Sequence, residues 1–258
     1  MSMPGKIIVE LTEMPKLNNP ALICGLPGSG YVGKLAVDHL VEELKGIPFA
    51  NIFSSSFPPQ VIIQPDGTAD LMKNTLYYCR SKSYDLVLLS GDAQPVSPES
   101  EYEMAEEITK ICEKLGVKEI YTLAAYITGS FTKTQRVYGT STSPEIVKSF
   151  EKHGIFPMTS GSITGMNGLI MGVGKRKKIR GICLLGETSG YVVDAMASKA
   201  VLETLAKILG LKLDLAGLTK KAQDTEQLVK TMEEQMGGRH HPESLPMQQP
   251  DKKLGYIS

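Results

Sequence analysis

The chain has no excess of charge of either sign, because 28 lysines and arginines balance 28 aspartates and glutamates over 258 residues. This balance argues against nucleic acid or an anionic membrane as the main partner. The basic run 175–178, followed by Arg180, is typical of a solvated loop. No segment approaches the ~20 consecutive apolar residues that cross a bilayer, and the first residues form no apolar signal segment. We expect a cytoplasmic protein.

The chain is also poor in residues that bind metals or transfer protons. The cysteines are far apart and form no CxxC pair, so we interpret them as reduced core residues: Cys24, Cys79, Cys112 and Cys183. Two histidines fall in helical patterns and two near the C-terminus: His39, His153, His240 and His241. Histidine-based acid–base chemistry therefore lacks its main candidate, and the pattern predicts no metal and no cofactor.

Short β-branched runs alternate with helical patterns over the first 212 residues. The runs predict strands at 7–9, 21–24, 60–63, 85–89, 119–123 and 181–185. The helical patterns cover 31–45, 98–115, 144–153, 165–176 and 190–209. Continuous apolar strands separated by helices predict an α/β domain, Rossmann-like, with a mainly parallel sheet flanked by helices.

Three segments depart from this alternation. Residues 48–80 contain a strand, turn and strand pattern around Pro65-Asp66-Gly67, which predicts a β-hairpin excursion. Residues 213–236 predict an amphipathic helix, which packs either on its own domain or on another subunit. Residues 237–258 are rich in proline and polar residues and predict a flexible tail. The bulky residues return at its end, as Leu254, Tyr256 and Ile257 before Ser258.

Glycine-rich turns follow the predicted strands or open the predicted helices. The first, Gly28–Lys34, satisfies the GxGxxG dinucleotide pattern, but residues 49–56 offer no acid to bind a ribose. The same turn nearly forms a phosphate-binding P-loop, except that Leu35 replaces the hydroxyl residue that binds magnesium. A packing role for these glycines is favoured over a phosphate site.

Three acidic residues lie just beyond strands or at helix starts, where ligand crevices of α/β sheets form: Asp92, Glu187 and Asp194. Such a group transfers protons if it is buried with a raised pKa. Alternatively, it accepts hydrogen bonds from loop amides and holds a turn rigid. The second role is favoured, since no nucleophile or base accompanies them.

Four motifs in one order carry a resemblance to a known family. They are the turns at 25–33, 91–95, 161–168 and 186–191. Together they resemble the proteasome assembly chaperone 2 family, in particular its archaeal homologues, over residues 5–210. The resemblance implies a nucleoside phosphorylase-like α/β body, oligomerisation, no established catalytic activity, and C-terminal segments that reach pockets on the α-ring of the proteasome core particle.

The family's tail signal is a hydrophobic residue, a tyrosine and any final residue. Here Tyr256 is third from the end and follows Gly255, so the order differs. The resemblance implies that Leu254, Tyr256, Ile257 and Ser258 bind proteasome α-subunits. The leading hypothesis is therefore a homo-oligomeric, non-enzymatic assembly chaperone or core-particle-binding protein. The alternative is an enzyme acting on a nucleotide or phosphorylated small molecule through the Gly28–Lys34 loop.

Overall fold

A mixed β-sheet forms the centre of the molecule in the computed structural model, which describes residues 6–80, 84–130, 135–223 and 227 and the backbone of 256–257. The strands follow one another in the order β1-β3-β6-β7-β2-β8-β12-β9-β10. Their bounds are β1 Ile7–Leu11, β2 Ala21–Cys24, β3 Ile47–Ser54, β6 Asn74–Cys79, β7 Leu86–Gly91, β8 Glu119–Ile127, β9 Val137–Ser141, β10 Phe156–Pro157 and β12 Arg180–Thr188.

The centre of this sheet is parallel and its sides contain antiparallel pairs. Strands β7, β2, β8 and β12 run parallel to their neighbours within this group. Strands β1, β3 and β6 continue from β7 by antiparallel pairing, and β9 is antiparallel to β12. The predicted α/β class is confirmed, and the sheet is mixed because antiparallel pairs flank the parallel core on both sides.

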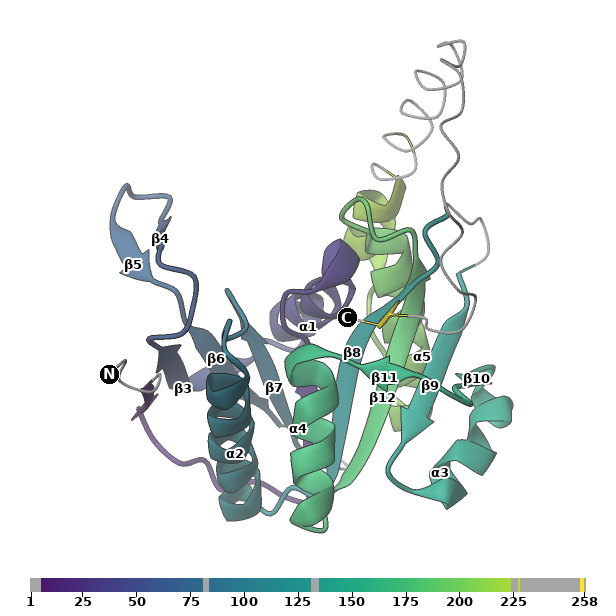
Figure 1. Ribbon diagram of the computed structural model, residues 1–258, viewed down its shortest axis with the longest axis horizontal. Helices are drawn as coiled ribbons and strands as arrows, with labels where there is room; N and C mark the ends of the chain where they lie inside the picture. The colour runs from purple at the N-terminus through teal and green to yellow at the C-terminus, as the bar shows by residue number, and fades with distance from the viewer. Residues whose placement is uncertain (1–5, 81–83, 131–134, 224–226, 228–255, 258) are drawn as a thin grey trace.

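Helices cover both faces of the parallel centre (Figure 1). On one face α2 (Pro98–Leu115) packs against α4 (Gly165–Arg176), and on the other α1 (Val32–Glu43) packs against α5 (Ala195–Leu209). Each face has its own apolar core, centred on Leu89, Met104 and Ile170 in the first case and on Leu88, Leu40 and Val201 in the second. A buried sheet of this kind needs the continuous apolar strands seen in the sequence.

Helix starts follow from local sequence signals. The α2 helix begins after Ser97, whose Oγ accepts a hydrogen bond from Ser100 N–H at 3.3 Å, and Pro98 occupies the first turn. It ends at Gly116, which has a φ of 78°. The predicted range 190–209 was wrong at its start, because Gly190 has a φ of 82° and the helix begins after Asp194, whose carboxylate caps it. The short α3 helix (Pro144–Ser149) continues as a 3₁₀ turn, η2 (Phe150–His153).

The segment 48–80 contains a smaller hairpin than expected. Strands β4 (Val61–Ile63) and β5 (Ala69–Leu71) form the antiparallel hairpin around Gly67, as predicted. The adjoining β3 and β6 belong to the main sheet, so the prediction that the segment 48–80 as a whole forms a hairpin excursion was wrong. The side chains of β6 are almost all buried against α2 or α1, which is the signal of a core strand.

The described start of the C-terminal helix lies against its own domain. Residues 216–223 are helical, and Leu218 is 1% exposed within the core on the α1 and α5 face, while Ala222 is 8% exposed. Except for residue 227, the rest of the predicted helix and the tail up to 255 lie outside the described residues. Within the described part of the chain, no helix is both long and apolar enough to cross a membrane.

All four cysteines are free and buried in the core, as predicted. Burial raises the pKa of every thiol, to about 11 for Cys79 and about 12 for Cys112 and Cys183. Cys24 also donates a weak hydrogen bond to Asn167 Oδ1 at 3.8 Å.

We predict that a disulfide reagent at pH 8 labels none of these thiols in the folded chain and all of them after unfolding, since the thiolate is the reacting form. The raised pKa values stabilise the fold below the unfolded thiol pKa of about 8.5, and this contribution is lost as the pH rises through 11 to 12. Labelling at the rate of a free cysteine in the folded state contradicts the prediction.

Candidate functional site

The glycine-rich turns meet at one end of the sheet, where the parallel strands end. Gln94 joins them, because its side-chain amide donates to the Pro27 carbonyl at 2.5 Å and its Oε1 accepts from Met166 N–H at 2.7 Å. One side chain therefore links the turn after β2, the turn after β7 and the start of α4. The sequence analysis placed these turns after strands or at helix starts but did not predict that Gln94 links them.

The first turn is packed against the backbone of the sheet. A Cβ added to Gly33 would lie 2.0 Å from the Leu123 carbonyl oxygen, and one added to Gly25 would lie 2.1 Å from the Gly33 carbonyl oxygen. Real Cβ atoms do not approach backbone so closely, so only glycine permits this contact. Helix α1 consequently begins directly on β8, which is the packing role favoured by the sequence analysis.

Lys34, the residue in the position of a P-loop lysine, has a partner on its own helix. Its Nζ lies 3.0 Å from Asp38 Oδ2, and the other oxygen of Asp38 accepts a hydrogen bond from Ser90 Oγ. The lysine is thus paired within α1, and its partner Asp38 connects it to Ser90 of β7. This arrangement agrees with a structural role for the Gly28–Lys34 loop better than with one in binding phosphate.

A second set of contacts ties this loop to the start of α5. Asp194 N–H donates to the Gly30 carbonyl at 2.8 Å, and Ser198 Oγ donates to the Val32 carbonyl at 2.7 Å. Asp194 also accepts from Thr188 Oγ1 at 2.7 Å and from Ala197 N–H at 2.9 Å. Its carboxylate therefore satisfies the first turn of α5 and the end of β12 together.

The other two acidic candidates also hold turns. Asp92 Oδ2 accepts from Lys73 N–H at 3.0 Å, and Asp92 N–H donates to the Lys73 carbonyl at 2.9 Å. Glu187 is 6% exposed and accepts from Arg136 N–H at 3.4 Å. These contacts match the turn-stabilising role that the sequence favoured. Within the described residues, no group of three or more His, Cys, Asp or Glu side chains is arranged to hold a metal.

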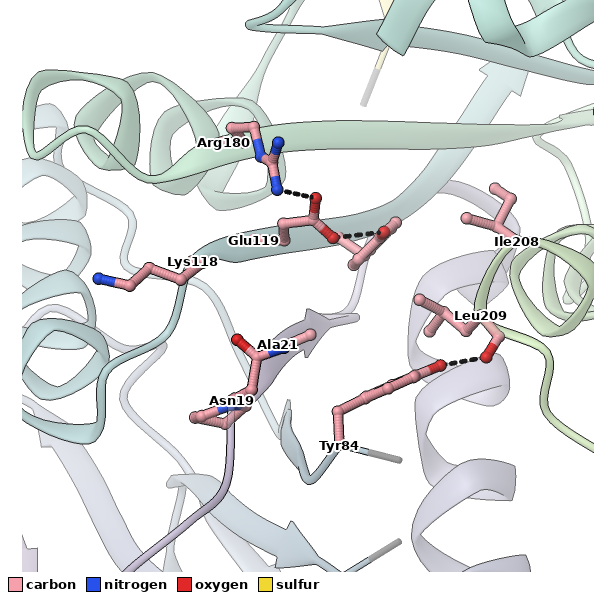
Figure 2. A pocket seen from close by; sticks show the side chains of 10 residues that line it. Asn19, Ala21, Tyr84, Lys118, Glu119, Arg180, Ile208 and Leu209 are labelled. Atoms are coloured by element: carbon pink, nitrogen blue, oxygen red, sulfur yellow. Dashed lines mark hydrogen bonds and ion pairs between the residues drawn. The ribbon is translucent and has the colours of Figure 1, made fainter. Parts of the chain in front are cut away.

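A pocket of about 250 Å³ lies at the opposite end of the sheet, where β2, β8 and β12 begin (Figure 2). Its polar groups bind one another: Arg180 contacts Glu119 at 2.7 Å, and the Tyr121 hydroxyl donates to Glu119 at 2.9 Å. Burial and the Glu119 carboxylate raise the pKa of Tyr121. The Tyr84 hydroxyl donates to the Leu209 carbonyl. The contact between Tyr84 and Leu209 connects the end of α5 to the sheet. The basic run 175–178 does not line the pocket.

The described residues near the C-terminus, 256 and 257, lie against their own domain. The backbone of Tyr256 and Ile257 forms the two-residue strand β13, parallel to β11 (Ser162–Ile163) and bridged to β8 at Tyr126 (Figure 1). Leu254 and Ser258, predicted as contact residues with them, lie outside the described residues. The sequence analysis did not anticipate this pairing, because a two-residue strand has no periodic signal.

Aromatic side chains surround the place where β13 joins β8. The rings of Tyr126 and Tyr138 stack with centroids 4.2 Å apart, and Tyr138 lies 5.7 Å from Phe156. The Arg136 guanidinium lies 5.6 Å from the centre of the Phe156 ring, which is 48% exposed as a residue. Sequence reasoning missed this cluster, which comes from three separate strands whose pairing only the fold reveals.

These features define an α/β body whose convergent turns are closed by packing and hydrogen bonds, with acidic residues that act as caps. The chain belongs to the PAC2 family, whose model matches residues 22–233. This confirms the resemblance that the four motifs indicated. The comparisons with individual proteins agree with it.

A curated relative is the uncharacterized protein MJ1210 of Methanocaldococcus jannaschii, with 40% identity over 90% of this chain and 91% of its own. Among solved structures, Pyrococcus furiosus PbaB, an archaeal proteasome activator, has a TM-score of 0.82 and 35% identity over 88% of this chain and 98% of its own. PbaA of the same organism, an archaeal homolog of proteasome-assembly chaperone, has a TM-score of 0.73 and 31% identity over 89% of this chain and 93% of its own.

We predict that Gly33→Ala destabilises the protein by about 1–3 kcal/mol or more, because the added methyl group meets backbone that cannot move aside. Gly172→Ala is the matched control, since a Cβ there meets nothing within 4 Å. In the interior of α4, it should stabilise by roughly 0.5–1 kcal/mol. Urea unfolding measures both changes. Equal stability of Gly33→Ala and the unaltered chain contradicts the packing role.

Proposed function

We propose that the chain is a non-enzymatic proteasome-binding protein, an assembly chaperone or activator that docks its C-terminal residues on α-subunits of the core particle. The observation that carries this proposal is the likeness to PbaB over 88% of the chain, at 35% identity. The turn-stabilising contacts of Asp92, Glu187 and Asp194 support a body without catalysis. Four free, buried cysteines support a reducing, cytoplasmic location.

The chemistry of the last residues suits a peptide anchor. Tyr256 supplies a ring for burial and a hydroxyl for hydrogen bonding, and the carboxylate of Ser258 pairs with a cationic side chain in a ring pocket. Leu254 or Ile257 adds the apolar contact. If it behaves as a flexible coil, a tether of about 20 residues would reach on the order of 25 Å.

Binding to the proteasome requires β13 to leave its place beside β11. A strand of two residues makes few backbone hydrogen bonds, each worth about 0.5–1.5 kcal/mol net. The tail therefore exchanges easily between the state in which β13 pairs with β11 and the state in which it is released. The fraction that is released multiplies the intrinsic affinity of the tail for its pocket.

One such tail binds weakly, because few side chains must offset the ordering of the tether. Several tails on one oligomeric body raise the overall affinity by factors on the order of 10² to 10⁴. A homo-oligomer facing a ring of repeated pockets meets this requirement.

Deletion of residues 254–258 tests the anchor. We predict at least a tenfold loss of affinity for the core particle, measured by surface plasmon resonance, and the same direction for Tyr256→Ala. Tyr102→Ala is the matched control, because Tyr102 is a 56% exposed tyrosine on the body, and it should leave binding unchanged. Unchanged affinity of the truncated chain assigns binding to the body instead.

The nucleotide-binding alternative has its own test. Because Lys34 pairs with Asp38 and the glycines contact backbone, we expect no calorimetric heat from a panel of adenine and guanine nucleotides at millimolar concentration. Micromolar binding that disappears in Lys34→Ala favours the enzyme hypothesis and overturns the structural role of the loop.

A further inference from the structure

Strand β1 is an edge strand with apolar side chains exposed on it. Within the part of the chain that the structure describes, β1 pairs with β3 and with no other strand. Ile8 is 44% exposed and Leu11 is 46% exposed. Edge strands of monomeric proteins carry prolines, bulges or inward-pointing charges that prevent pairing. The stretch Ile7-Ile8-Val9 has none of these, and its charged neighbours Lys6 and Glu10 are exposed, so among the described residues the edge is open to another strand.

The β4–β5 hairpin extends from the side of the molecule that holds β1 (Figure 1). Val61 is paired with Leu71, and Ile63 is paired with Ala69. Because side chains alternate along a strand, these four residues lie on one face of the hairpin. Val61, Ile63 and Leu71 are 50%, 66% and 66% exposed. A two-stranded hairpin is marginally stable by itself in water, and neighbouring exposed apolar side chains mark interaction surfaces.

A groove of about 550 Å³ joins the two features. Ile8 of β1 and Phe53 of β3 line one side, and Val61 and Leu71 of the hairpin line the other. Ile8 and Phe53 are register partners, which places both side chains on the same face of the sheet. Edge, groove and hairpin thus form one surface, the β1–hairpin surface, defined by Ile8, Phe53, Val61, Ile63 and Leu71.

The backbone hydrogen bonds of β1 show which groups face the open edge. Ser55 N–H donates to the Lys6 carbonyl at 3.3 Å, and Thr12 N–H donates to the Phe49 carbonyl at 2.9 Å. In an antiparallel pair the bonding residues alternate, so the even-numbered residues of β1 bond to β3. The groups that point to the open edge belong to the odd-numbered residues, which are Ile7, Val9 and Leu11.

We propose that the β1–hairpin surface binds a second copy of this chain, with the two β1 strands paired antiparallel about a two-fold axis at Ile8. In this register Ile7 of one copy forms hydrogen bonds with Val9 of the other, and both use the groups that the open edge offers. The two Ile8 side chains meet as a non-hydrogen-bonded pair, where side chains approach most closely. The sheets of both copies then become continuous.

Charge complementarity selects this register over its neighbours. With the axis at Ile8, Lys6 of each copy faces Glu10 of the other, so two ion pairs flank the central isoleucines. An axis at Val9 instead places Glu10 opposite Ile8, and an axis at Ile7 places Lys6 opposite Ile8. Lys6, Ile8 and Glu10 share one face of the strand, so the pairs form beside the groove. A self-complementary edge of this kind fits an identical strand, which makes the contact isologous.

The surface deepens the homo-oligomer of the proposed function and rests on it. A charge-reversal cycle tests the contact in the full chain. We expect Lys6→Glu and Glu10→Lys each to weaken dimerisation about tenfold in a sedimentation-velocity concentration series, because two symmetry-related pairs become repulsive. The double variant, Lys6→Glu with Glu10→Lys, exchanges the charges and should restore the dissociation constant. Indistinguishable assembly of all four proteins overturns the register.

Proline substitutions test the backbone contact separately. Val9→Pro removes an N–H that points to the open edge, so the monomer should keep its melting temperature within a few degrees while dimerisation is lost. Ile8→Pro is the control that removes an N–H bonded to β3, and it should lower the melting temperature. Assembly that survives Val9→Pro overturns the surface but leaves tail docking intact. If the unaltered chain is a monomer at all concentrations, the homo-oligomer is overturned as well. The affinity of the chain without residues 254–258 for the core particle reports on tail docking alone.

Discussion

The close contact between the start of α1 and the backbone of β8 determines how the rest of the molecule is arranged. Only hydrogen atoms fit between Gly33 and the Leu123 carbonyl, and Gly25 lies equally close to Gly33. This contact places α1 directly on the parallel strands and brings the Gly30 carbonyl within reach of Asp194. Helix α5 is thereby positioned beside α1. The end of the sheet that holds a ligand in many α/β proteins is here occupied by packed backbone and by helix caps.

Much of the fold was predictable because its signals are local. The bounds of α2 and α4 agree with the predicted ranges, and those of α2 are marked in the sequence by a capping serine, a first-turn proline and a terminal glycine. Strand β2 has the predicted bounds for a similar reason, because four consecutive apolar residues stand between two turn-forming segments of the sequence. The roles of Asp92 and Asp194 were also within reach, as acids next to turns favour backbone amides.

Other parts depend on contacts between distant residues and leave no local mark. The assignment of β6 to the main sheet is decided by its pairing with β7, and its apolar pattern resembles that of a hairpin arm. Gln94 is hydrogen-bonded to Pro27, which lies 67 positions before it, and to Met166, which lies 72 positions after it. The pairing of β13 with β11 joins the end of the chain to a two-residue strand, which no periodicity identifies. The predicted partner contacts of Leu254, Tyr256, Ile257 and Ser258 stay predictions.

The body and the tail have complementary physical tasks in this account. The body is closed by packing, and its acidic residues are engaged with backbone amides, which suits a platform. The tail carries its bulky residues at the far end of a polar tether, which suits an anchor that exchanges between two sites. The backbone of Tyr256 and Ile257 pairs with β11 in the structure.

Electron cryomicroscopy of the full chain bound to the proteasome core particle tests the central claim most directly. The account predicts density for residues 254–258 in pockets between α-subunits, together with an empty place beside β11 on every body whose tail is engaged. A complex in which the body contacts the ring while Tyr256 and Ile257 stay paired with Ser162 and Ile163 contradicts it.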